Sequence, residues 1–140
     1  MIFRELKKND YQNYLTLINT FRIVGVDVKK NEFNEIYEKI FNMGKIFVCE
    51  LDNKLVASAT VLIEQKFIHK LAKYAHIEDV VVMPEYRGMR IGKKIIEYII
   101  NYSKKETVYK IVLNCNEDLF NFYNKNNFIR NGIYMSLILN

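Results

Sequence analysis

The sequence predicts an α+β domain with a mixed, mostly antiparallel β-sheet flanked by helices. Two neighbouring segments with alternating apolar residues are joined by Asp52-Asn53, which is typical of an antiparallel hairpin. In the second half of the chain, strand-like and helix-like segments alternate, and this favours parallel pairing. Half of the 140 residues are hydrophobic and one is Pro, so the chain can bury a sizeable core. We expect one domain over 1–140 with the element order β-α-α-β-β-β-α-β-α-β.

The first half of the chain is expected to hold a short strand, two helices and the hairpin. The predicted elements are a strand over 2–6, helices over 10–21 and 31–44, and strands over 45–51 and 55–64. Asp10 can cap the first helix, and Gly44 can end the second. The second helix carries one apolar stripe at helical spacing, formed by Phe33, Ile36, Tyr37, Ile40 and Phe41.

The second half begins with a basic loop and then alternates between strands and helices. We expect the loop over 65–73, strands over 74–83, 109–113 and 133–139, and helices over 91–102 and 117–126. Pro84 ends the first of these strands, and the strand over 109–113 reads as buried. The longer helix has an apolar stripe made of Ile91, Ile95, Tyr98, Ile99 and Tyr102.

Several classes of protein are disfavoured by composition. Cys49 and Cys115 are too few for a disulfide framework and have no metal-binding spacing. His69 and His76 lack acidic or cysteine neighbours at ligand spacing, so no metal site is expected. No apolar run is long enough to span a membrane, and the first ten residues lack a signal-peptide pattern. We therefore expect a soluble, cytoplasmic protein.

The positive charge of the chain is concentrated in one segment. The formal net charge is +5, and residues 66–105 carry nine Lys and Arg against four acidic residues. The rest of the chain carries twelve of each. This distribution suggests a localised anion-binding site, although a solvated charged face accounts for it equally well.

The most informative local pattern lies between a strand and a long helix. It reads Tyr86-Arg87-Gly88-Met89-Arg90-Ile91-Gly92-Lys93. Glycines allow close approach of the backbone to a ligand, and free N–H groups at a helix start attract anions. The pattern therefore predicts a phosphate site, with a plain helix start and two turn glycines as the alternative. The glycine spacing matches neither a Walker P-loop nor a dinucleotide-binding fingerprint.

An acidic pair interrupts an otherwise apolar strand. Glu78 and Asp79 are adjacent, so their side chains are expected on opposite faces of the sheet, with at least one directed into the protein or a cleft. A buried carboxylate needs a partner, so the pair indicates either a structural ion pair or a group that binds or deprotonates an amine. Cys115 reads as a core thiol, and Tyr123 as one packing aromatic among ten tyrosines.

Taken together, these segments resemble the GNAT superfamily, and within it the glucosamine 6-phosphate N-acetyltransferases. The glycine pattern followed by a Phe122-Tyr123 helix is similar to the acetyl-CoA-binding core of the superfamily. More specific are the segments Ala57-Ser58-Ala59-Thr60, Glu64-Gln65-Lys66-Phe67-Ile68-His69, His76-Ile77-Glu78-Asp79-Val80-Val81-Val82 and Tyr109-Lys110-Ile111-Val112-Leu113. The resemblance covers essentially the whole chain.

The resemblance implies an enzyme that moves the acetyl group of acetyl-CoA, without a metal, to the 2-amino group of glucosamine 6-phosphate, on the route to UDP-N-acetylglucosamine. It also implies a homodimer. The cofactor contacts would come from Val80, Val81, Val82, Arg87, Gly88, Met89, Arg90, Ile91, Gly92, Lys93 and Tyr123. The sugar phosphate contacts would come from Lys66, Phe67, Ile68, His69, Glu78, Asp79, Tyr109 and Lys110. The catalytic set would be Tyr123, which protonates the thiolate, with Glu78 and the Asn114 carbonyl as candidates to accept the amine proton.

The sequence departs from the family pattern mainly where the sugar phosphate would bind. A threonine in the first helix appears as Arg22, and an arginine near the C-terminus appears as Ile138. We hypothesise that Arg22 restores the missing charge. Two alternatives follow: a GNAT enzyme for another small-molecule or protein amine, or a non-catalytic module that binds CoA or nucleic acid. A short anion loop beside an acidic pair favours a small ligand over nucleic acid.

Overall fold

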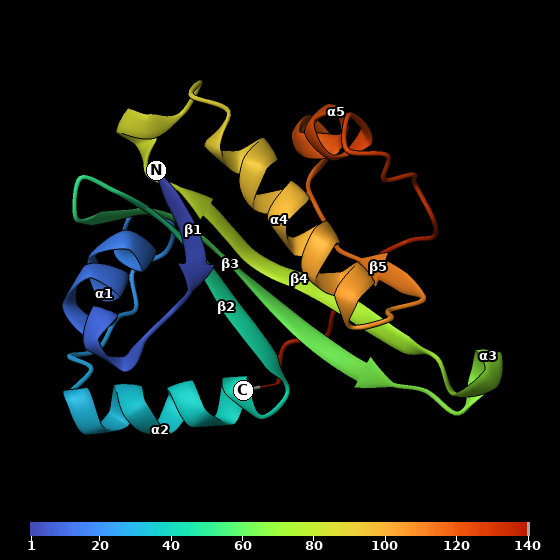
Figure 1. The fold of residues 1–140 in the computed structure, drawn as a ribbon, viewed down its shortest axis with the longest axis horizontal. Coiled ribbons are helices and arrows are strands. Elements are labelled where there is room, and N and C mark those ends of the chain that lie inside the picture. Colours follow the sequence, from blue (N-terminus) through green and yellow to red (C-terminus); the bar gives the residue numbers. More distant parts are fainter. Residues whose placement is uncertain (140) are drawn as a thin grey trace.

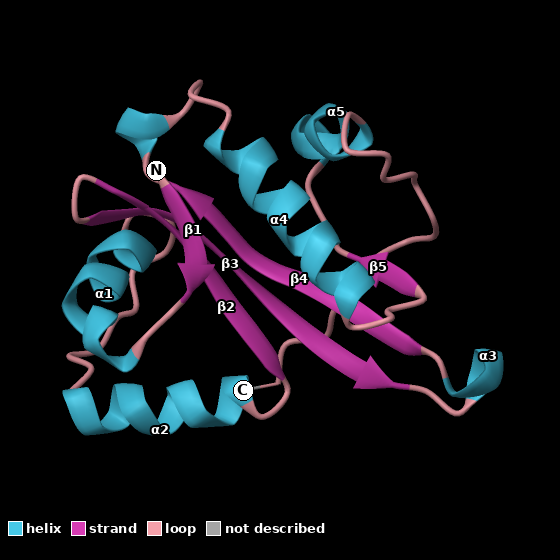
Figure 2. Ribbon diagram, viewed as in Figure 1, coloured by secondary structure: helices cyan, strands magenta, loops and turns pink. Residues whose placement is uncertain are grey.

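The computed structural model describes residues 1–139 and is built on a twisted five-stranded sheet (Figures 1 and 2). The strands are β1 (Ile2–Glu5), β2 (Gly44–Leu51), β3 (Lys54–Gln65), β4 (Lys73–Val82) and β5 (Lys110–Val112). They lie in the order β1-β2-β3-β4-β5. Neighbours from β1 to β4 are antiparallel, and β5 is parallel to β4. The predicted mixed, mostly antiparallel sheet is confirmed.

The helical elements lie on both faces of the sheet. They are η1 (Lys8–Asp10), α1 (Tyr11–Asn19), α2 (Lys30–Phe41), α3 (Ile68–Leu71), η2 (Pro84–Tyr86), α4 (Ile91–Lys105), η3 (Glu117–Leu119) and α5 (Phe120–Asn124). In Figure 1, α4 crosses one face of the sheet, whereas α1 and α2 lie together beside β1 and β2. No helix among residues 1–139 has the length and apolarity needed to cross a bilayer.

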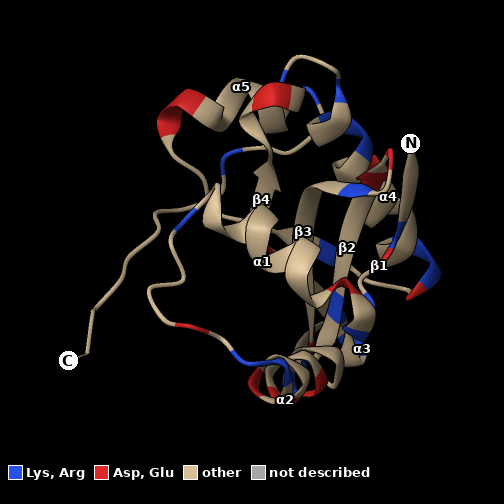
Figure 3. Ribbon diagram, turned by 90° about the vertical axis from the view of Figure 1, so that its left-hand side faces the viewer, with Lys and Arg blue, Asp and Glu red and all other residues tan. Residues whose placement is uncertain are grey.

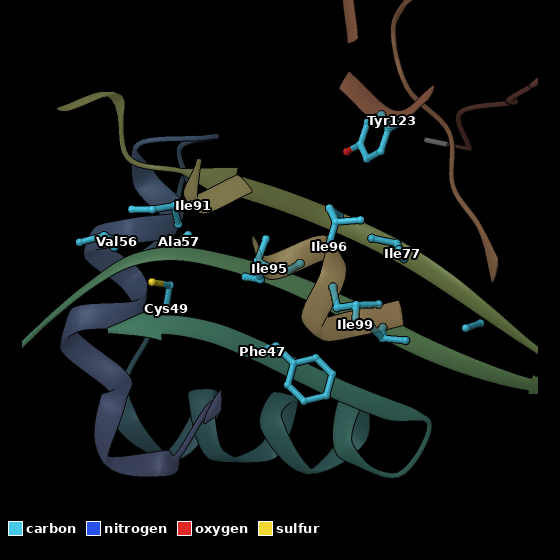
Figure 4. Close-up of a cluster of buried hydrophobic side chains, with 13 residues drawn as sticks. Phe47, Cys49, Val56, Ala57, Ile77, Ile91, Ile95, Ile96, Ile99 and Tyr123 are labelled. Carbon is cyan, nitrogen blue, oxygen red and sulfur yellow. The ribbon is translucent and has the colours of Figure 1, made fainter. Parts of the chain in front are cut away.

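The alternation of side chains along the strands creates two hydrophobic cores, one on each face. In β2, Phe47 and Cys49 are buried against α4, whereas Ile46 and Val48 are buried against α1 and α2. This follows from the two-residue period of a strand, which sends successive side chains to opposite faces. The core on the α4 face is drawn in Figure 4.

Helix α1 begins at Tyr11, directly after Asp10, as predicted. Two other predictions about the helix ends are wrong, and both have a local cause. Asp10 does not cap α1, because its carboxylate accepts hydrogen bonds from the Arg4 guanidinium (2.7 and 2.9 Å) and from the Lys7 N–H (2.7 Å). Gly44 does not end α2 but begins β2. A Cβ atom at Gly44 would lie 1.8 Å from the carbonyl oxygen of Val61, so glycine is needed there for close contact between strands.

Three predictions of burial are also wrong. Ile36 belongs to the expected apolar stripe of α2 but is exposed. The strand predicted as buried over 109–113 is only partly buried in β5, and Tyr109 beside it is 62% exposed. Cys115, expected as a core thiol, is exposed. The spacing of apolar residues in the sequence identifies an apolar face, but it does not show whether another element packs on that face.

The expected last strand over 133–139 does not form in the described chain. Its six large apolar side chains are 69–91% exposed, and the segment extends away from the rest of the fold (Figure 3). A strand gains its hydrogen bonds only from a neighbouring strand. The alternating pattern is therefore present, but residues 133–139 pair with no strand among residues 1–139.

Candidate active site

The central feature of the site is a split between β4 and β5. The two strands pair only where Tyr74–His76 meet Lys110–Val112. Beyond His76, β4 continues to Val82 without β5 at its side, and α5 lies on the far side of the opening (Figure 1). This edge of β4 therefore has no neighbouring strand over residues 77–82, and the backbone groups of a free strand edge bind an extended ligand readily.

A β-bulge lies at the middle of the same strand. Thr60 faces Glu78 and Ser58 faces Val81, so two residues of β4 lie opposite the single Ala59. Asp79 at the bulge has a left-handed φ of 49°. A bulge of this kind bends a strand and redirects its side chains. Asp79 and Glu78 are both exposed, so neither carboxylate is buried inside this chain. The other form of the prediction, that one of them faces a cleft, stays a prediction.

The glycine segment forms a turn at one end of the split, before α4. Gly88 has a left-handed φ of 84°, which suits glycine, and a Cβ atom at this position would meet nothing within 4 Å. Arg90, just before the helix, is also left-handed (φ 60°). The first N–H groups of α4 have no partner within the helix, and the helix dipole adds partial positive charge. The turn therefore offers a surface for an anion such as a diphosphate.

Some side chains of this turn contact other protein groups and do not point to a bound anion. The Arg87 Nε donates to the Val82 carbonyl (3.3 Å), and the Lys93 ammonium lies 3.5 Å from Glu97. The Arg90 side chain forms no hydrogen bond and no ion pair with the described residues. Gly92 lies against the Phe122 ring, where a Cβ would approach to 3.3 Å. Its role in this structure is therefore close packing between α4 and α5.

Tyr123 lies at the split, on α5. It is buried in the core against α4, and its ring packs edge-on against Phe122 and Phe128. Figure 4 shows the ring between α5 and β4. Burial, and to a smaller extent the nearby Cys115, together raise the pKa of Tyr123 to about 12. The phenol thus keeps its proton at neutral pH and can donate it to a developing anion.

A cavity of about 960 Å³ opens beside Tyr123. It lies between β5, α5 and the segment that follows α5; its lining includes Val112, Asn114, Cys115, Tyr123, Phe128 and Ile133. The structure therefore brings together Tyr123 and Asn114, two of the three predicted catalytic residues. Glu78 does not line this cavity.

Four of the predicted sugar phosphate residues lie near α3 together with Tyr74, and we call these five the distal cluster: Lys66, His69, Tyr74, Tyr109 and Lys110. Tyr109 and Lys110 of this cluster also line the cavity beside Tyr123. His69 stacks on Tyr109 (centroids 5.0 Å apart), and the Lys110 ammonium lies 4.5 Å from the centre of the Tyr74 ring. Sequence reasoning missed Tyr74, which both lysines approach. Its place opposite Lys110 in the β4–β5 ladder could not be read from the sequence.

Glu64 connects the distal cluster to His76 on β4. Glu64 pairs with Lys66, and its carboxylate lies 2.9 Å from the Nε2 atom of His76. Both contacts lower the pKa of Glu64. Phe67 and Ile68, also predicted to bind the sugar, are exposed in the connection between β3 and β4.

The distal cluster and the glycine turn lie at opposite ends of β4. Eight residues separate Tyr74 from Val82, which corresponds to about 26 Å of extended strand. One chain therefore does not gather all the predicted residues into one place. Arg22 is exposed between α1 and α2, with its guanidinium 5.8 Å from the centre of the Phe21 ring.

Comparison with known proteins shows which family the chain resembles. Residues 12–128 match the Acetyltransferase (GNAT) family. The chain is 32% identical over 139 residues to the glucosamine 6-phosphate N-acetyltransferase of Arabidopsis thaliana, covering 95% of this chain and 93% of that protein. The enzyme of the same name from Candida albicans is 28% identical over 138 residues, covering 95% and 92%.

The fold agrees with these relatives. The crystal structure of glucosamine-6-phosphate N-acetyltransferase from Arabidopsis thaliana superposes with a TM-score of 0.93 over 99% of this chain and 98% of that one, at 31% identity. A putative acetyltransferase from Agrobacterium tumefaciens shares the fold, with a TM-score of 0.89 at 22% identity. The chain belongs to the GNAT family of acetyltransferases.

Proposed function

We propose that this chain transfers the acetyl group of acetyl-CoA to the 2-amino group of glucosamine 6-phosphate. The observation that carries acetyl transfer is the split between β4 and β5, with an anion-binding turn at one end and a buried, protonated Tyr123 at its side. The sugar is supported by the relatives, which share one name at 28–32% identity over most of the chain.

The chain has the features that an acetyl-CoA site requires. The first N–H groups of α4 and the Arg90 guanidinium would hold the diphosphate. The unpaired edge of β4 would take the pantetheine chain, because a strand edge donates and accepts hydrogen bonds at regular intervals. N–H groups between Val80 and Val82 would face the thioester oxygen. Each such donor contributes roughly 3–4 kcal/mol to stabilising the oxyanion.

The reaction needs a neutral amine and a protonated leaving group. The carbonyl of Asn114 accepts a hydrogen bond from the amine and orients it, and Glu78, through a water molecule, accepts the proton that the amine loses. The amine nitrogen then bonds to the thioester carbon, the carbon–sulfur bond breaks, and the Tyr123 hydroxyl gives its proton to the sulfur. Holding both substrates side by side lowers the entropic barrier, so transfer is direct and no acetyl-enzyme forms.

The active enzyme is proposed to be a homodimer. Apolar side chains of the segment after α5 are exposed: Ile129, Ile133, Tyr134, Met135, Leu137, Ile138 and Leu139. The outer edge of β5 also has no strand beside it among residues 1–139. Exposed apolar surface next to a free strand edge favours association. A second copy could bring its distal cluster to the open end of the split of the first, beside Glu78 and Asp79.

The first prediction concerns the anion-binding turn. Arg90→Gly removes the charge and keeps a residue suited to the left-handed φ. We expect the KM for acetyl-CoA to rise about tenfold, because a charge-assisted contact to phosphate is lost, and kcat to change little. Steady-state kinetics measures both. Lys39→Ala, on the exposed side of α2, is the matched control. An unchanged KM in Arg90→Gly would remove Arg90 from the cofactor site.

The second prediction concerns the acceptor phosphate. Arg22→Ala is expected to raise the KM for glucosamine 6-phosphate about tenfold through loss of a charged contact, with no change in the KM for acetyl-CoA. Lys29→Ala, at the end of the same connection, serves as the control because its side chain is also exposed. If KM for the sugar stays at the wild-type value, Arg22 does not bind the phosphate.

The proposed function is tested by following release of CoA thiol over a panel of amines. The panel contains glucosamine 6-phosphate, unphosphorylated glucosamine, a polyamine, an aminoglycoside and a peptide with a free N-terminus. We expect kcat/KM for the phosphorylated sugar to exceed the others by orders of magnitude. A faster reaction with another amine would reassign the acceptor. No thiol release with any amine would support a non-catalytic CoA-binding module.

A further inference from the structure

Three side chains form one row across the sheet, at the end of β4 that is remote from the glycine turn. Glu64 of β3 lies opposite Tyr74 of β4, and Tyr74 lies opposite Lys110 of β5. Residues directly opposite each other in neighbouring strands carry their side chains on the same face. Lys66 follows Glu64 by two residues and pairs with its carboxylate. Tyr74 therefore lies between an ion pair on one side and Lys110 on the other.

Tyr74 is buried without belonging to a hydrophobic core. It is 9% exposed, yet it packs in neither of the two cores. Its ring is nearly parallel to the rings of His69 and Tyr109, with centroids 6.3 and 6.0 Å away. The ammonium groups of Lys110 and Lys66 lie 4.5 and 5.2 Å from its centre. This ring is thus covered by cationic and polar aromatic side chains, an arrangement that apolar packing does not require.

The two lysines on this ring differ in how their charge is balanced. Lys66 pairs with Glu64, whereas Lys110 forms no ion pair with another described residue. An aromatic ring attracts an ammonium group that lies within about 6 Å of its centre, so Tyr74 holds Lys110 without cancelling its charge. Lys110 also lines the cavity beside Tyr123. An unneutralised ammonium group is therefore held at the wall of this cavity.

We propose that Tyr74 is a positioning residue for the phosphate group of the acceptor. Its ring holds the Lys110 ammonium at the cavity wall, where the ammonium binds a phosphate oxygen. A phosphate monoester carries roughly two negative charges at neutral pH and offers three acceptor oxygens, so it can bind Lys110 together with Arg22. This inference rests on the proposed function, because it deepens the assignment of the acceptor. Tyr74 acts through Lys110 and does not touch the substrate.

The test begins with Tyr74→Leu, which removes the aromatic face and keeps an apolar side chain. The KM for glucosamine 6-phosphate is expected to rise about fivefold, the effect of losing one cation–π contact. The KM for acetyl-CoA, and kcat/KM for unphosphorylated glucosamine, should each stay within about twofold of wild type. Tyr74→Phe keeps the ring and should restore the wild-type KM. A merely structural role of Tyr74 would instead lower kcat/KM for both sugars alike.

Phe41→Leu is the matched control for loss of an aromatic ring. The Lys45 ammonium lies 5.0 Å from the centre of the Phe41 ring, and neither residue lines the cavity beside Tyr123. Phe41→Leu should lower the melting temperature without changing the preference for the phosphorylated sugar. If Phe41→Leu raised the KM for glucosamine 6-phosphate as much as Tyr74→Leu, the effect would be structural and the proposal would be wrong.

A double-mutant cycle shows whether Tyr74 acts through Lys110. Lys110→Met alone should raise the KM for glucosamine 6-phosphate at least about fivefold, through loss of a charged contact. Adding Tyr74→Leu to Lys110→Met should raise it by less than about twofold more, because coupled residues are not additive. Equal rises in both backgrounds would overturn the proposal, as would an unchanged KM in Tyr74→Leu. An unchanged KM in Lys110→Met would overturn it even if Tyr74→Leu did not fold.

These outcomes are distinct from a failure of the proposed function. Each of them compares variants with a wild-type enzyme that acetylates glucosamine 6-phosphate. Failure of the wild type to acetylate this sugar would remove the proposed function, and this inference with it.

Discussion

Tyr123→Phe is expected to lower kcat about 100-fold or more while leaving the KM for acetyl-CoA within about twofold. A positioned general acid contributes about 10²–10⁴ in rate, and phenylalanine fills the same space in the core without a proton to give. The thiolate must then leave unprotonated or take its proton from water. Steady-state kinetics at saturating acetyl-CoA measures the loss. A loss confined to kcat identifies an interaction used in the transition state.

The pH profile provides a second readout for Tyr123. Because the pKa of Tyr123 is about 12, the phenol stays protonated throughout the neutral and mildly alkaline range. The wild-type kcat should therefore show no alkaline decline from this group between pH 7 and about pH 10. Tyr102→Phe is the control, since Tyr102 packs on Phe47 in the same core. Retention of more than half of kcat in Tyr123→Phe would contradict its role as the acid.

Removing residues 135–139, which do not line the cavity beside Tyr123, is expected to convert a dimer into a monomer and to lower kcat/KM for glucosamine 6-phosphate at least about 100-fold. The segment exposes a run of apolar side chains that a second copy can cover. Without that copy, the distal cluster of a partner does not reach the split, and a misplaced substrate loses a factor of this size. Sedimentation velocity measures the mass, and thiol release measures the activity.

The truncated chain also provides its own control for folding. Residues 135–139 contribute to neither of the two hydrophobic cores, so the circular dichroism spectrum should keep its helical and strand signals. Full activity in a truncated chain that sediments as a monomer would refute the need for a second copy. A truncated chain that still sediments as a dimer would show that the contact lies elsewhere.

The parts of the fold that could be predicted are those whose signal is local. Asp52 and Asn53 predicted a tight hairpin, and both have left-handed φ angles, 50° and 60°, as that turn requires. The apolar stripe of α4 was visible in the sequence because its period matches a helix. The strand over 133–139 was predicted from an equally clear alternation of side chains. Alternation identifies a chain segment able to pair, but it does not supply the partner strand.

The candidate site was only partly predictable for the same reason. The glycine turn is contiguous in sequence, so its place before α4 could be expected. The exposure of Glu78 and Asp79 depends on a bulge against Ala59, which no local pattern announces. The packing of Gly92 against Phe122 joins two helices, and the position of Tyr74 in the distal cluster depends on pairing with β5. Such contacts arise only when distant segments meet.

The most direct measurement is a crystal structure of this chain with glucosamine 6-phosphate and a CoA thioether that cannot transfer its acyl group. We expect the diphosphate on the backbone between Arg87 and Lys93, and the thioether sulfur beside the Tyr123 hydroxyl. The amino group should lie next to Glu78 and Asp79. A diphosphate bound elsewhere, or a sulfur remote from Tyr123, would contradict it.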